Sequence, residues 1–203
     1  MRRKLTQRGR DRREQLLAHA ARLFAERGYH PTAVSDIVAS LGVGKGVFYW
    51  YFSSKEELLG EILAEAQRRL RRRQADAIGT IDDPLLRLEA GIRATLSFFD
   101  EHRDFWRLVQ VASHDRRFTA GLRAGQEVAV SDTARVIQDG MDAGVIPGGD
   151  ASLAANAVLG VLNHVTRVYL QRDGGSVGDL ADQVVAFCVG GVQAQPAVVS
   201  PAS

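Results

Sequence analysis

The sequence predicts an all-α fold of about nine helices, with a small N-terminal three-helix domain and a larger C-terminal helical domain. Apolar residues recur at intervals of three and four along almost the whole chain, which is the spacing of one face of an α-helix. Clusters of glycine or proline fall between these periodic segments. The length of 203 residues and the 45% hydrophobic content suffice for two unequal domains.

The expected helices begin and end at residues with recognisable capping chemistry. Gly28 follows the first helix and can take the left-handed conformation that stops a helix. Ser54 and Glu57 form a capping box, so the fourth helix is predicted to begin at Lys55. The predicted helices span residues 10–27, 34–41, 45–51, 55–77, 83–101, 103–113, 116–143, 150–172 and 176–191.

Charge is distributed unevenly along the chain. The formal net charge is only +2, but residues 1–75 hold 16 lysines and arginines against 8 acidic residues, so this part carries +8 and the remainder −6. Such asymmetry predicts a polyanion-binding head on a body that does not bind polyanions. The basic N-terminal arm either adds phosphate contacts or is a solubilising tail. Five arginines of the fourth helix are expected to form a solvated face: Arg68, Arg69, Arg71, Arg72 and Arg73.

Several features predict a cytoplasmic protein. Cys188 is the single cysteine and lies in an apolar run, so we expect a small core residue and no internal disulfide. Residues 6–14 are polar where a secretory signal would be apolar. Asn163, His164 and Arg167 interrupt the best candidate for a membrane span, so none is expected.

No catalytic site can be placed on the sequence. A Ser/His/Asp arrangement, a glycine-rich phosphate loop and an activated cysteine on a defined turn are all lacking. The spacing of His102, Asp104, His114 and Asp115 fixes no metal coordination geometry. We therefore expect neither an enzyme nor a cofactor or metal site.

Residues 32–52 have the outline of a helix-turn-helix. Two short predicted helices are joined by residues 41–44, a connection with two glycines. The first helix has an apolar stripe that includes Ile37 and Val38, with Thr32 as its candidate N-cap.

The second short helix is expected to expose two large aromatic side chains. Phe48 and Phe52 belong to its apolar face, which leaves Tyr49 and Trp50 beside Lys45 on the other. A helix of seven residues is too short to be stable alone, and two exposed aromatic rings need a partner. The DNA major groove admits such a helix, so we interpret this face as a DNA contact. The alternative is that Tyr49 and Trp50 pack on the body.

An ordered series of residues between positions 12 and 62 carries a family signature. It comprises Leu23-Phe24-Ala25-Glu26-Arg27-Gly28-Tyr29, then Thr32, Ile37, Gly42-Val43 and Lys45-Gly46, and finally the continuous stretch from Phe48 to Leu58. In these residues the chain resembles the N-terminal domain of the TetR (tetracycline repressor) family.

The resemblance implies a DNA-binding regulator, most simply a repressor that binds a pseudo-palindromic operator as a homodimer. It further implies that the last two helices form the dimer interface and that a small, largely apolar effector shifts the fourth helix and releases the operator. By motif position, the residues expected at DNA are Thr32, Gly44, Lys45, Gly46, Tyr49, Trp50 and Lys55. The family often has Ser in place of Gly44 and Tyr-His in place of Trp50-Tyr51, and these departures bear on base preference.

The body is expected to hold the effector in a mostly apolar pocket. The candidate ligand residues are Phe98, Trp106, Gln110, His114, Phe118, Asn163, His164 and Arg167. The last three are polar residues on an otherwise apolar helix, so they need partners either in the pocket or in the dimer interface.

The predicted domains are a basic flexible arm (residues 1–9), a helix-turn-helix DNA-binding domain (10–54), a helical ligand-binding and dimerisation domain (55–193) and a flexible tail (194–203). Two rival hypotheses remain open. One is a DNA-binding regulator without a small-molecule effector, controlled by protein contacts or concentration. The other is an unrelated helical enzyme or binding module.

Overall fold

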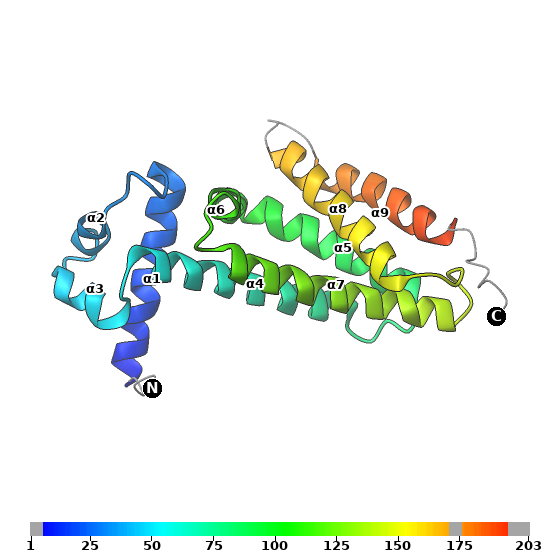
Figure 1. The fold of residues 1–203 in the computed structure, drawn as a ribbon, viewed down its shortest axis with the longest axis horizontal. Coiled ribbons are helices and arrows are strands. Elements are labelled where there is room, and N and C mark those ends of the chain that lie inside the picture. The colour runs from blue at the N-terminus through cyan, green and yellow to red at the C-terminus, as the bar shows by residue number, and fades with distance from the viewer. Residues whose placement is uncertain (1–5, 171–175, 195–203) are drawn as a thin grey trace. The chain divides into compact units, whose positions relative to one another are not determined.

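The computed structural model describes residues 6–170 and 176–194, and within these ranges every regular element is an α-helix (Figure 1). The helices are α1 (Gln7–Arg27), α2 (Val34–Ala39), α3 (Lys45–Tyr51), α4 (Lys55–Ile78), α5 (Pro84–Glu101), α6 (Arg103–Ser113), α7 (Thr119–Asp142), α8 (Ala151–Leu170) and α9 (Val177–Gln193). The all-α prediction is confirmed, and each helix lies within a few residues of its predicted bounds. The predicted C-terminal tail lies outside the described residues, apart from Ala194.

The first helix is longer than predicted. α1 begins at Gln7, and Thr6 is its N-cap because its hydroxyl accepts a hydrogen bond from the Gly9 N–H at 3.2 Å. Residues 7–9, which we expected in a flexible arm, are therefore helical. The first five residues of that arm lie outside the described part of the chain.

The start of α4 has the predicted capping chemistry. Ser54 Oγ accepts a hydrogen bond from the Glu57 N–H at 3.1 Å. The Glu57 carboxylate in turn accepts from the N–H of Ser53 at 2.6 Å and from its hydroxyl at 2.7 Å. These bonds satisfy N–H groups that have no partner inside the helix, so α4 begins at Lys55.

Gly28 ends α1 with a positive φ, as predicted, but it does not adopt the left-handed helical conformation. Its φ of 90° and ψ of 153° lie in a region that is open essentially to glycine alone. Its N–H donates to the Phe24 carbonyl at 3.0 Å and so closes the last turn of α1. The connection from α1 to α2 therefore depends on a glycine.

The chain packs into two units. Unit 1 contains the residues up to Gln67 together with Asp104–Leu122, and unit 2 contains Arg68–Arg103 and the residues from Arg123 onward. The domain boundary predicted at residue 54 falls inside unit 1, because the first half of α4 and most of α6 share a core with α1–α3.

Unit 1 is built around one apolar cluster. Leu16 of α1, Ile37 of α2, Phe48 of α3, Leu59 of α4 and Leu108 of α6 are all buried in it. Helices as short as α2, with six residues, and α3, with seven, are unstable in isolation. Burial of their apolar faces in this cluster is what stabilises them.

The core of unit 2 is formed mainly by α5, α8 and α9, and α5 packs chiefly on α9. Ile92, Val158, Leu162 and Val184 are buried there. Cys188 belongs to the same core, as predicted, and burial raises the pKa of its thiol above the usual value.

Within residues 6–170 and 176–194, no helix is both long and apolar enough to cross a membrane. The same residues contain no group of three or more histidine, cysteine or acidic side chains that could hold a metal ion.

We predict that Gly28→Ala lowers the free energy of unfolding by about 1–3 kcal/mol, because an alanine is strained at this φ and ψ. Chemical denaturation measures the change. Gly60→Ala in α4 is the matched control, since the Cβ that it would add has no described atom within 4 Å outside the adjoining residues and the backbone of the helix itself. It should leave stability unchanged or raise it by up to about 1 kcal/mol. Equal stability of Gly28→Ala and Gly60→Ala would contradict the turn conformation.

Candidate functional site

α3 has one buried face and one exposed face, as predicted. Phe48 and Phe52 are 0% and 1% exposed, whereas Tyr49 and Trp50 are 56% and 54% exposed. The two pairs differ in exposure because of their positions around the helix. Residues 48 and 52 lie four apart and face the core, whereas residues 49 and 50 project from the opposite side. Two large aromatic rings are therefore presented to solvent by a helix that the core holds in place.

The first turn of α3 has open space beside its backbone. Gly44 is the N-cap, with φ −81° and ψ 157°, and no side chain caps this helix. Apart from the adjoining residues and the backbone of the helix itself, no atom of the described chain lies within 4 Å of a Cβ added at Gly44 or Gly46. Lys45 lies between them and is exposed. A partner can approach the backbone closely at these two glycines.

Thr32 lies in the interior and not at the expected DNA-contacting surface. The residue is 1% exposed, and its hydroxyl donates to the Gly28 carbonyl at 2.7 Å. It is not the N-cap of α2 either: that position is Ala33, whose N–H donates to the Asp36 carboxylate at 2.8 Å. Thr32 thus stabilises the turn between α1 and α2.

Lys55 is also engaged inside the protein. Its ammonium group donates to the carbonyls of Tyr29 at 2.8 Å, Thr32 at 2.9 Å and His30 at 3.3 Å. It also lies 4.4 Å from the centre of the Tyr29 ring, close enough for a cation–π interaction. An ammonium group has three donors, and all three have partners, so the expected phosphate contact by Lys55 is not supported.

Charged and aromatic side chains surround Lys55 within unit 1. Glu56 accepts hydrogen bonds from the Tyr29 hydroxyl at 3.2 Å and from Arg117 at 2.6 Å. Arg117 also pairs with Asp115 at 2.6 Å. Nothing in the sequence signals these pairs, because Glu56 and Arg117 are 61 positions apart.

The ionisation of these groups is shifted by their contacts. Burial raises the pKa of Tyr29 to about 12, with the negative charge of Glu56 acting in the same direction. Hydrogen bonds from Arg117 lower the pKa of Asp115 to about 2. Desolvation lowers the pKa of Lys55, and Arg117 adds to the effect. The carboxylates remain ionised at neutral pH and keep the ion pairs intact.

Five of the seven predicted DNA residues therefore share one exposed surface on α3 and its N-cap. They are Gly44, Lys45, Gly46, Tyr49 and Trp50, and we call this set the α3 surface. Thr32 and Lys55 support the fold behind it.

The eight predicted ligand residues are divided between the two units. Trp106, Gln110, His114 and Phe118 belong to unit 1, and Phe98, Asn163, His164 and Arg167 belong to unit 2. Phe98, Trp106 and Phe118 are buried core residues. Asn163, His164 and Arg167 are exposed on α8, where Arg167 lies 3.1 Å from His164 Nδ1. None of the eight lines the cavity described next.

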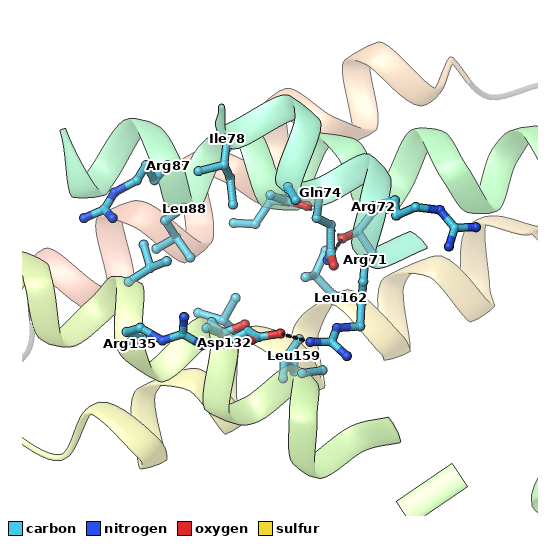
Figure 2. Close-up of a pocket in the computed structure, with 18 of the residues that line it drawn as sticks. Arg71, Arg72, Gln74, Ile78, Arg87, Leu88, Asp132, Arg135, Leu159 and Leu162 are labelled. Atoms are coloured by element: carbon cyan, nitrogen blue, oxygen red, sulfur yellow. Dashed lines mark hydrogen bonds and ion pairs between the residues drawn. The ribbon is translucent and has the colours of Figure 1, made fainter. Parts of the chain in front are cut away.

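Unit 2 contains a cavity of about 650 Å³ between α4, α5, α7 and α8 (Figure 2). Its wall includes three of the arginines that we expected on a solvated face, Arg68, Arg71 and Arg72. The three arginines are exposed, as expected, and they also line the cavity. The volume falls within the range of about 300–1,000 Å³ that is usual for small-molecule sites.

Both the N-terminal and the C-terminal part of the chain match known protein families. The family model for bacterial regulatory proteins of the tetR family matches residues 16–62, and the model for a tetracyclin repressor-like C-terminal domain matches residues 82–192. The HTH-type transcriptional regulator YdgC of Bacillus subtilis is 26% identical over 193 residues, covering 91% of this chain and 94% of YdgC.

Two further similarities are informative. The HTH-type transcriptional repressor KstR2 of Mycobacterium tuberculosis is 37% identical over 91 residues, which span 45% of this chain and 46% of KstR2. A transcriptional regulator from Saccharomonospora viridis, solved in complex with choline, has the same fold. Its TM-score is 0.76 at 23% identity, covering 88% of this chain and 95% of that one.

We predict that Lys55→Met lowers the free energy of unfolding by about 1.5–3 kcal/mol, the range for hydrogen bonds to a charged group. The methionine keeps the apolar stem but removes the donor shared by three carbonyls. Lys45→Met is the matched control, because Lys45 is exposed on the α3 surface, and it should not change stability. Thermal and chemical unfolding measure both. Unchanged stability of Lys55→Met would show that its bonds to the turn are dispensable.

Proposed function

The chain belongs to the TetR family of bacterial regulatory proteins, and we propose on that premise that it is a homodimeric repressor released from a pseudo-palindromic operator by a small molecule. It is a helix-turn-helix transcription regulator, and proteins of this family bind DNA. The observation that carries the finer proposal is the α3 surface, where Tyr49 and Trp50 are more than half exposed beside Lys45.

The α3 surface has the chemistry of a major-groove contact. The groove admits an α-helix, and the N-terminal residues of that helix reach the base edges. Lys45 supplies a positive charge and Tyr49 a hydroxyl for phosphate oxygens, while Gly44 and Gly46 allow close backbone approach. Trp50 supplies apolar surface for a thymine methyl group or a sugar.

A second copy of the chain is the proposed partner of α8 and α9. Leu153 on α8 is 68% exposed and Phe187 on α9 is 67% exposed, which is unusual for large apolar side chains. Small exposed residues follow each of them at helical spacing, namely Ala157 and Gly160 on α8 and Gly190 and Gly191 on α9. A two-fold dimer through this face would present two α3 helices to the two half-sites of an operator.

The effector site that we propose is the cavity of unit 2. The complex of the Saccharomonospora viridis protein with choline supports the idea that this fold can hold a small organic molecule. KstR2, a repressor, supports repression as the output. A regulator without any effector remains the alternative, and the cavity favours the effector hypothesis.

We predict that Tyr49→Ala and Trp50→Ala each weaken binding to duplexes selected from a random pool by about tenfold or more, with no loss of stability. The physical reason is that each substitution removes a large side chain that would be desolvated at the groove. Fluorescence anisotropy with a labelled duplex measures the affinity.

Leu86→Ala is the matched control, because Leu86 is a similarly exposed apolar residue, 52% accessible, on α5 in unit 2. It should leave affinity unchanged. Full affinity of both aromatic variants would rule out α3 as the DNA-contacting helix.

A further inference from the structure

We propose that the cavity of unit 2 binds an amphipathic carboxylate, meaning a molecule with an apolar body and one terminal carboxylate group. The inference names the ligand class of the proposed effector site and rests on the proposed function only for its effect on DNA. Two properties of the lining carry it: an excess of arginine and an apolar floor.

Arginines outnumber aspartates among the residues that line the cavity. Five arginines and two aspartates line the cavity. Arg71 of α4 and Arg135 of α7 both pair with one carboxylate, that of Asp132, at 3.2 and 2.6 Å (Figure 2). Two guanidinium groups therefore share a single negative charge. A ligand carboxylate placed beside Asp132 would give each arginine its own anion, in the bidentate geometry that guanidinium groups favour.

Arg87 adds a second indication of a missing acceptor. Its Nη2 donates to Asp139 at 2.8 Å, but its Nε is buried and has no hydrogen-bond partner in the described part of the chain. Buried donors in native proteins are normally satisfied, so an orphaned N–H in a cavity wall is an exception that needs explanation.

Much of the remaining lining is apolar, and its largest apolar side chains lie mainly on α5 and α8. α8 contributes Val158, Leu159 and Leu162, and α5 contributes Leu88 and Ile92. Four of these five side chains are at most 5% exposed and belong to the core of unit 2. The part of the lining that α8 contributes is entirely apolar, whereas the five arginines come from α4, α5 and α7. Such a lining suits a molecule with an apolar body and one charged end.

The same lining disfavours an organic cation. Quaternary ammonium groups are recognised by aromatic rings through cation–π contacts. No phenylalanine, tyrosine or tryptophan is among the described residues that line this cavity. The excess of arginine would in addition repel a positive charge.

Three probes with the same ten-carbon chain test the charge preference: decanoate, 1-decanol and decyltrimethylammonium. Each is titrated into the full chain by isothermal titration calorimetry, below its aggregation concentration. We expect decanoate to bind at least tenfold more tightly than 1-decanol, and decyltrimethylammonium to bind most weakly. The proposal is overturned if decanoate does not bind, or if the alcohol or the ammonium compound binds as tightly.

A matched pair of variants tests the location. Arg135 and Arg107 are both 68% exposed, and each pairs with an aspartate three residues earlier, but only Arg135 lines the cavity. Arg135→Gln should raise the Kd for decanoate about tenfold and leave that for 1-decanol unchanged, whereas Arg107→Gln should alter neither. Arg71→Gln serves as a second cavity variant if Arg135→Gln melts at a lower temperature. Equal effects of the cavity variants and Arg107→Gln would contradict the site.

Release of a labelled duplex is measured separately from ligand binding. The proposed ligand class and the proposed effector role can then fail independently. Tight, Arg135-dependent binding of decanoate without duplex release would uphold the ligand class and refute the effector role. Duplex release by 1-decanol as efficiently as by decanoate would uphold an effector and refute the carboxylate preference.

Discussion

The ammonium group of Lys55 holds the turn between α1 and α2, and the placement of the helix-turn-helix depends on that turn. Three carbonyls of residues 29–32 accept hydrogen bonds from this one group. Gly28 supplies the unusual backbone conformation at the start of the turn, and Thr32 donates back to its carbonyl. The turn is therefore fixed by polar contacts to a single side chain at the first residue of α4.

The apolar core then holds α3, the helix that we propose contacts DNA, in one position. α2 and α3 are too short to persist alone, so burial of Ile37, Phe48 and Phe52 determines where they lie. Tyr49 and Trp50 are left exposed as a consequence of that burial. The proposed DNA-contacting face of α3 is thus the face that is not buried in the core.

Local pattern was sufficient to predict the helices and the two faces of α3, because apolar spacing and capping residues act within a few positions of each other. The internal contacts of Lys55 and Thr32 could not be predicted, because they depend on carbonyls of a turn whose geometry no local pattern encodes. A pocket in the body was expected, but its lining residues were not predicted, for a related reason. A row of exposed arginines on a helix looks the same in sequence whether or not its members also pair with another helix, as Arg71 does with Asp132 of α7, 61 positions away.

The salt dependence of duplex binding tests the account most directly. Removal of one lysine–phosphate interaction should reduce the slope of log K against log salt by about 0.9. Measured on the same selected duplex, at a temperature where all variants are folded, Lys45→Met should flatten the slope by that amount. Lys55→Met should leave the slope unchanged, because its ammonium group binds the protein's own carbonyls. A flattened slope in Lys55→Met, with an unchanged slope in Lys45→Met, would contradict the account.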